Sequence, residues 1–312
     1  MSKIVSYGLF LAIIAGFLFP AGDSLKWLIP YLLAIIMFFS FLKLDYKKEN
    51  FFRKEIIYYL AVGLVMIPFV VYVLTFALEP MLRLGIFLVA ITPTAISAPI
   101  VVDMIKGDRE LIVSNVVIYN LLAPLTYTFM LSLYFGESDI AIPVKDIFVK
   151  LILMIFVPLI AALVVKRFVR IFDRTSAIKE GLLNMSRYVS PLSFILVIGV
   201  AVASASLSLR TIETGTLVIV AAIALALAIV SFGAGAVLGT IFRRKLSKKK
   251  PKREKEDDST KKALMVIFGH KNSTLTTWII LSNFGGTAVI PIIIYIICHH
   301  VINSILIYKY AE

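Results

Sequence analysis

Ten long apolar stretches, separated by short charged or Pro- and Gly-bearing breaks, dominate this chain of 312 residues. A helix that crosses a bilayer needs about 20 mostly apolar residues. Hydrophobic residues make up 60% of the chain, whereas an ordinary soluble domain has roughly 45–50%. The pattern predicts an all-α membrane protein with ten transmembrane helices, at residues 4–20, 26–42, 56–78, 82–105, 111–135, 144–165, 183–208, 215–241, 263–284 and 287–308.

The basic residues predict the orientation of these spans. Of the 32 Lys and Arg residues, 26 fall on one side of the predicted spans, five fall on the other, and Lys271 belongs to neither. Cationic loops stay in the cytoplasm, so the chain is predicted to lie in the cell (inner, cytoplasmic) membrane with both termini cytoplasmic. The longest polar segment, 243–262, is predicted to be a cytoplasmic basic linker. The net charge of +13 therefore reflects topology and contact with membrane lipids, and no nucleic-acid partner is expected.

The chain carries few groups suited to metal, redox or hydrolytic chemistry. Cys298 is the single cysteine, which excludes disulfides within the chain and multi-cysteine metal sites. His299 and His300 are adjacent on a predicted helix, about 100° apart around its axis, so we expect that they cannot both face one site. Recognisable hydrolase, metalloprotease and P-loop motifs are missing. We therefore expect no enzyme activity, no metal and no cofactor, and transport that is passive or driven by a gradient.

Ten spans divide into two halves of five, and an odd number in each half gives the halves opposite orientations, as in inverted-repeat transporters. The fourth span of each half is interrupted, at Thr92–Pro99 in the first and Gly269–Thr274 in the second. A proline can simply kink a membrane helix. Breaks at matching positions in two halves, however, indicate a midplane binding site. The sequence predicts two inverted five-helix repeats with broken, crossed helices 4 and 9.

Lys271 is the most informative single residue. It follows Lys262 by nine residues, or about 13 Å of helix at about 1.5 Å per residue, which places it near the middle of the bilayer. A charge at that depth is normally paired or lines a watery cavity. Asp103 could be its partner, although Lys106 or interfacial water could equally pair with Asp103. The candidate substrate-binding and ion-coupling residues are Lys271, Asn272, Ser273, His270, Thr274, Pro99, Ser97, Asn115, Asn120 and Asp103.

Three glycines, Gly233, Gly235 and Gly239, superficially resemble a nucleotide-binding loop. They lie inside an apolar span with no strand before it, which such a loop requires. Small residues in a membrane helix let a neighbouring helix approach closely. We therefore predict close helix packing at these glycines.

Two segments resemble the bile acid:sodium symporter (BASS) superfamily. Residues 269–304 read GHKNSTLTTWIILSNFGGTAVIPIIIYIICHHVINS, which is similar to the family's Gly-x-Gln-Asn-Ser-Gly-Leu segment and the Ala-x-Pro turn and His-Asn-x-Ser-like element that follow it. Residues 94–125 read TAISAPIVVDMIKGDRELIVSNVVIYNLLAPL, which resembles the family's Lys-Gly-Asp turn and Leu-Leu-Ala-Pro run. The resemblance implies core helices at about 56–135 and 215–308, and panel helices at about 4–42 and 144–208. It also implies transport of organic anions by alternating access, usually driven by sodium.

The chain departs from the family's pattern at its sodium sites. Ile267 stands where the family usually has a sodium-binding Glu, and Lys271 stands where it has Gln. The family's Ser-Asn pair at the first break is replaced by Ala98 and Pro99. An ammonium group close to a sodium site would repel the ion by several kcal/mol at intermediate dielectric. The resemblance therefore implies a divergent member that lacks the usual sodium-site residues.

These observations favour a secondary transporter of small organic anions, namely carboxylates. Transport would be sodium-independent or proton-coupled symport, with Lys271 supplying the charge that sodium supplies in relatives. Helix N-termini at the breaks would help to hold a carboxylate. One alternative is a monovalent cation/proton antiporter that uses Lys271 and Asp103. Another is a passive channel or membrane sensor.

Overall fold

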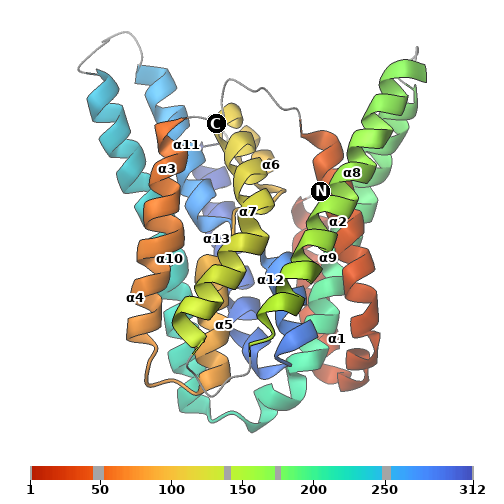
Figure 1. Ribbon diagram of the computed structural model, residues 1–312, viewed down its shortest axis with the longest axis vertical. Coiled ribbons are helices and arrows are strands. Elements are labelled where there is room, and N and C mark those ends of the chain that lie inside the picture. Colours follow the sequence, from red (N-terminus) through yellow and green to blue (C-terminus); the bar gives the residue numbers. More distant parts are fainter. Residues whose placement is uncertain (1, 45–52, 137–141, 173–176, 248–253, 311–312) are drawn as a thin grey trace.

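The chain forms a bundle of helices (Figure 1). The computed structural model describes residues 2–44, 53–136, 142–172, 177–247 and 254–310. Within these ranges the regular elements are all helical, and they are α1 (Ser2–Leu18), η1 (Pro20–Leu28), α2 (Ile29–Lys43), α3 (Lys54–Tyr58), the π-helical η3 (Tyr59–Met66), α4 (Ile67–Leu74), α5 (Pro80–Ile91), α6 (Ala98–Met104), α7 (Arg109–Phe135), α8 (Val144–Phe172), α9 (Ala177–Thr211), α10 (Thr214–Ser247), α11 (Glu254–Gly269), α12 (Ser273–Asn283), η5 (Thr287–Val289) and α13 (Ile290–Tyr310).

Seven helical stretches of the described chain are long and apolar enough to cross a membrane. The predicted spans outside this group are 4–20, 82–105 and 263–284. The first corresponds to the short apolar helix Tyr7–Leu18. The other two are each divided into two helices, α5 with α6 and α11 with α12, so neither half reaches the required length. The protein is therefore an all-α, multi-pass membrane protein.

The helices pack in two groups. In one group, α1 packs on α9, and α2 packs on both α8 and α9. In the other group, α10 packs on α11 and α13, and α5 packs on α13. The start of α1 and the end of α13 both lie in the upper half of Figure 1.

The predicted basic linker 243–262 is shorter than expected. Helix α10 continues to Ser247, and α11 already begins at Glu254. Lys, Arg and Glu have good helix propensity, so a charged sequence can extend a membrane helix beyond the bilayer. The remaining six positions of the linker, 248–253, lie outside the described residues.

The predicted close packing of the α10 glycines is correct for two of the three. A Cβ atom on Gly235 would lie 2.3 Å from the Leu264 carbonyl oxygen, and one on Gly239 would lie 2.5 Å from Cα of Lys261. Both contacts are with the backbone of α11. A Cβ atom on Gly233 would have nothing within 4 Å, because this glycine faces away from α11.

An ion pair joins the starts of two helices at one end of the bundle. Asp108 caps α7 by accepting a hydrogen bond from Leu111 N (3.0 Å), and its other carboxylate oxygen accepts one from Arg53 Nη1 (2.7 Å). Burial lowers the pKa of Arg53, but the carboxylates of Asp108 and Glu55 outweigh this effect and the net pKa is raised. The guanidinium therefore stays charged at every physiological pH, and the pair is permanent while Asp108 is ionised.

Asp108→Ala is expected to lower the free energy of unfolding by about 2–4 kcal/mol, because it removes both a helix cap and a charge-assisted hydrogen bond. Asp103→Ala is the matched control. Asp103 pairs with Arg109, but the two side chains are 41% and 51% exposed, and exposed pairs contribute at most about 1 kcal/mol. Denaturation in mixed micelles measures both losses, and equal losses would contradict the assigned role of Asp108.

Candidate functional site

Proline chemistry explains why the first broken helix ends where it does. Pro93 has no N–H group and disfavours the helical conformation at the residue before it. Thr92 accordingly adopts φ −59° and ψ 128°, and α5 ends at Ile91. Pro99 lies in the first turn of α6, where the missing N–H costs little. The predicted break is therefore confirmed but ends sooner than expected, since Pro99 belongs to a helix.

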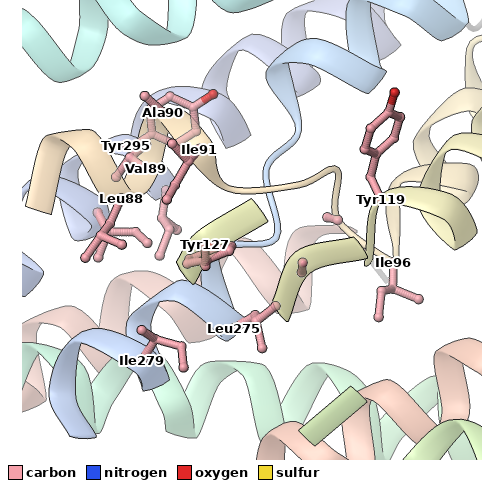
Figure 2. Packing of buried hydrophobic residues seen from close by; sticks show 14 of the residues in the cluster. Leu88, Val89, Ala90, Ile91, Ile96, Tyr119, Tyr127, Leu275, Ile279 and Tyr295 are labelled. Carbon is pink, nitrogen blue, oxygen red and sulfur yellow. The ribbon is translucent and has the colours of Figure 1, made fainter. Parts of the chain in front are cut away.

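The two breaks cross and pair with each other. Ala95 N donates to His270 O (2.8 Å), and Asn272 N donates to Pro93 O (2.7 Å). These bonds make an antiparallel bridge between Thr94 and Lys271. Figure 2 shows apolar side chains of α5, α7, α12 and α13 packed around this crossing. The predicted crossing of the two interrupted helices is confirmed.

Each helix that ends at the crossing leaves backbone carbonyls without partners in its own helix, and in a membrane these must be satisfied within the protein. At the end of α5, the Thr92 hydroxyl donates to Leu88 O (2.6 Å). At the end of α11, the Thr94 hydroxyl lies 2.7 Å from Ile267 O, and Tyr295 OH donates to Gly269 O (2.8 Å). Side chains of the first break and of α13 therefore replace the missing helical hydrogen bonds.

The side chain of Lys271 satisfies one more of these carbonyls. Its Nζ donates to Ala90 O (3.2 Å), near the C-terminal end of α5, where the helix dipole favours a cation. The ammonium also lies 5.7 Å from the ring centroid of Tyr59, within the range of a cation–π interaction. Lys271 is only 2% exposed, and no described carboxylate lies within ion-pair distance of it.

Buried amides form a second feature of the crossing. Asn120 on α7 donates to Thr94 O (2.9 Å) and accepts from Asn272 Nδ2 (2.8 Å), so it binds both breaks. The Asn115 Oδ1 atom lies 2.8 Å from the Thr94 hydroxyl oxygen, and the Asn115 Nδ2 atom has no partner among the described residues. Thr274 donates to Asn272 Oδ1 (3.3 Å). The amides fix the backbone of the breaks in a buried polar network.

Three hydroxyl groups lie beside this network. The hydroxyl oxygens of Thr92 and Thr276 are 2.7 Å apart, and Tyr127 OH lies 2.5 Å from that of Thr276. All three residues are buried. The cluster joins the end of α5, the middle of α7 and the first turn of α12.

The structure brings most of the predicted site residues together. Lys271, Asn272, Ser273, Thr274, Asn115 and Asn120 are all buried at the crossing. Ser97 is exposed at the start of α6. Asp103 lies apart from Lys271, because its carboxylate pairs with Arg109. The ion pair between Lys271 and Asp103 that the sequence suggested is therefore wrong. Asp103 lies at the exposed end of α6, where its carboxylate pairs with Arg109.

The expectation that His299 and His300 cannot face one site is also wrong. Their ring centroids lie 4.9 Å and 6.0 Å from that of His270. Two positions 100° apart on a helix can both reach a side chain that lies between them. Among the described residues, no group of three or more His, Cys, Asp or Glu side chains has the arrangement of a metal site.

Sequence reasoning missed two residues of the site. Thr94 lies within the predicted break, but its role in binding Asn115 and Asn120 depends on the crossing itself. Tyr127 follows Asn120 by seven residues, which is two helical turns, so both residues lie on one face of α7. That spacing could have identified Tyr127.

Two broken helices that cross inside a multi-pass bundle are typical of secondary transporters, which bind substrates and ions where such helices meet. The model of the SBF-like CPA transporter family matches residues 5–312, so the chain belongs to that family. This is the bile acid:sodium symporter family that its residues resemble, and the predicted resemblance is confirmed. No curated protein matches the chain. The protein is therefore a membrane transporter.

Proposed function

We propose that the protein is a secondary transporter of small carboxylates, and that the ammonium of Lys271 binds the substrate carboxylate. Lys271 takes the place of the positive charge that sodium supplies in relatives. Transport is then sodium-independent, with the proton as the candidate coupling ion. The oligomeric state plays no part in this proposal.

One observation carries the proposal: Lys271 is a buried cation without a described counter-anion. A buried charge that lacks a partner is costly, so the site is electrostatically incomplete when empty. An ammonium group has three N–H donors, and the bond to Ala90 O uses one of them. Two donors remain for an incoming carboxylate. Helix α12 begins at Ser273, two residues after Lys271, and the dipole at the N-terminus of this helix also favours a negative charge there.

The same geometry disfavours sodium at this place. Sodium would need several oxygen ligands, and the Ala90 carbonyl already accepts from Lys271. Ile267, at the position of the family's usual Glu, offers no side-chain oxygen. A cation held near the ammonium would be repelled by several kcal/mol.

The architecture that we propose for transport is ten spans in two inverted repeats, with both termini in the cytoplasm. Helices α1, η1, α2, α8 and α9 form the panel, and the remaining helices form the core. Lys150 of α8 donates to Asn283 Oδ1 (2.9 Å) at the end of α12, and the hydroxyls of Ser208 on α9 and Thr287 on η5 are 2.9 Å apart. Breaking such contacts between the two groups would let the site face the other side of the membrane.

Transport by purified protein in proteoliposomes tests the proposal. We expect uptake of at least one labelled probe among acetate, pyruvate, succinate and citrate, with equal rates in sodium and in potassium buffers. Lys271→Gln is expected to reduce this uptake at least about tenfold, because losing a charge-assisted hydrogen bond costs about 1.5–3 kcal/mol. Unchanged uptake with an unchanged driving ion in this variant would overturn the role of Lys271.

The melting temperature provides the control for Lys271→Gln. The change removes an unpaired buried charge, which is costly to hold in the protein, and the glutamine amide still offers an N–H donor for Ala90 O. We therefore expect a melting temperature equal to or above that of the wild type. Lost uptake with retained stability assigns the effect to substrate binding.

The antiporter alternative would use a Lys–Asp pair in the membrane, and it is less well supported because Asp103 pairs with Arg109. If the alternative were correct, Asp103→Asn would abolish monovalent-cation exchange in the absence of any organic solute. A passive channel would show single-channel conductance, and a sensor would bind a carboxylate without flux. These assays use the same proteoliposomes.

A further inference from the structure

The chain has three histidines, and all three meet at one place. His270 comes from the break between α11 and α12, and His299 and His300 come from the middle of α13. Their ring centroids are 4.9 Å apart for His270 and His299, 6.0 Å for His270 and His300, and 4.4 Å for His299 and His300. His270 and His299 are 6% and 2% exposed. The proposed binding of a carboxylate by Lys271 uses none of these rings.

The hydrogen bonds of this histidine cluster are incomplete. Asn303 Nδ2 donates to His270 Nδ1 (2.9 Å), which leaves the Asn303 Oδ1 atom buried without a partner among the described residues. His300 Nε2 is likewise buried and without a partner in that part of the chain. A protonated His270 would need an acceptor at Nδ1, and a 180° rotation of the Asn303 amide supplies Oδ1 there. Asn303 can therefore serve both the neutral and the charged form of His270.

The most exposed histidine of the cluster lies at the contact between α9 and α13. His300 is only half-buried, and its ring lies 5.8 Å from that of Phe194 on α9. This contact joins the two packing groups of helices. Movement of α9 relative to α13 would uncover His300 first, because His299 and His270 lie behind it.

Among the described side chains, the fixed charges on the elements that pack against α13 are engaged elsewhere or exposed. Lys271 donates to Ala90 O, and Arg83 of α5 stacks over the Tyr72 ring (4.0 Å). The remaining charges behave in the same way: Asp103 of α6 pairs with Arg109, Lys262 of α11 lies over the Tyr310 ring, Arg210 of α9 donates to Phe17 O, and Lys179, Glu180 and Arg187 of α9 are exposed. The other titratable side chains near the cluster are Tyr295, whose ring lies 5.5 Å from that of His299, and the adjacent Cys298. No described carboxylate faces the imidazoles.

We propose that His270, His299 and His300 form a single proton-binding site, which takes up one proton from water when the α9–α13 contact opens and carries it with the substrate. The lone pair of one ring nitrogen accepts the proton. The neighbouring neutral rings then accept hydrogen bonds from the N–H groups of the resulting imidazolium. A second proton would place two cations on rings whose centroids lie no more than 6.0 Å apart, where they repel strongly at low dielectric. While the contact is closed, a lone imidazolium is costly without a counter-charge. A carboxylate bound nearby provides that charge, so proton and substrate stabilise each other.

Histidine labelling makes a direct test possible, because the chain has no histidine outside the cluster. Full-length protein with ¹⁵N-histidine is reconstituted in liposomes, and the ring nitrogens are followed by solid-state NMR between pH 8 and pH 5. We expect one-third of the ring intensity to move to the imidazolium position as the pH falls. No imidazolium, or more than one per chain, would overturn the proposal.

Variants test the site by a second measurement that needs no organic substrate. A rapid pH step is applied to proteoliposomes on a solid support, and the transient current reports proton binding. We expect the current to be lost in His299→Gln and His300→Gln, and to be kept in Cys298→Ser, a neighbour on the same helix. Loss in Cys298→Ser, or an unchanged current in both histidine variants, would overturn the proposal.

The inference rests on the proposed transport function, but the two can fail separately. Lys271→Gln is expected to keep the proton current while it loses carboxylate uptake. If the current were lost in Lys271→Gln and normal in the histidine variants, proton binding would be assigned to Lys271. That result would overturn the proposed histidine site. Wild-type protein that binds the proton but transports none of the carboxylate probes would refute the transport proposal alone.

Discussion

Gly235→Val is expected to prevent α11 from packing on α10 and to leave little folded protein. A Cβ atom at this position would lie 2.3 Å from the Leu264 carbonyl oxygen and 2.7 Å from Cα of Met265. Neither atom belongs to a flexible side chain, so only a backbone shift could relieve the clash. Overpacking costs about 1–3 kcal/mol where side chains can adjust, and we expect at least the upper value here. Size-exclusion profiles and melting curves in detergent measure the loss.

Gly233→Val is the matched control for this change. It introduces the same side chain two residues earlier in the same helix, where nothing lies within 4 Å of the new Cβ position. Valine has a slightly better helix propensity than glycine, so the melting temperature should stay the same or rise a little. A similar loss in both variants would show that valine is harmful in α10 generally and would refute the role of the close contact.

The packing of these glycines shows which parts of the fold a sequence can predict. Apolar length, the positions of proline and the small residues of α10 are local properties, and each predicted span coincides with one to three consecutive helical elements. The end of α5 follows from Pro93 alone. The length of the basic linker could not be predicted in the same way. A segment rich in Lys, Arg and Glu has the same composition whether it extends a helix or forms a solvated loop.

The contacts within the site depend on the crossing, and this limits what sequence can predict. The sequence identifies Lys271 by its predicted depth in the membrane, which follows from its distance along the chain from Lys262. Its partner, Ala90 O, lies 181 residues away in the chain, and no local pattern predicts that contact. Sequence suggests Asp103 as the partner because it is the acidic residue of the predicted span that contains the first break. Its position in the span does not specify which side of the helix carries the charge. The meeting of three histidines likewise requires the turn between α12 and α13.

Asn120→Leu is expected to cause the largest loss of any single change in the polar network. The asparagine is fully buried, and it holds Thr94 O (2.9 Å) in one break and Asn272 Nδ2 (2.8 Å) in the other. Leucine leaves both groups buried without this partner, and each such group costs about 1–3 kcal/mol. We expect a loss of about 2–5 kcal/mol in unfolding free energy. Carboxylate uptake should also fall, because the crossing that holds Lys271 loosens.

Two further variants decide whether this loss comes from the network. Asn283→Leu makes the same substitution near the end of α12, where the side chain is half-buried, and should cost less than about 1.5 kcal/mol. Asn120→Leu combined with Asn272→Leu removes both partners of one hydrogen bond, which is far less costly than removing one. The double variant should therefore be at least about 1 kcal/mol more stable than the sum of the single losses predicts. Strict additivity would mean that the two amides stabilise their breaks independently, and that the crossing is held by its backbone hydrogen bonds and by Lys271.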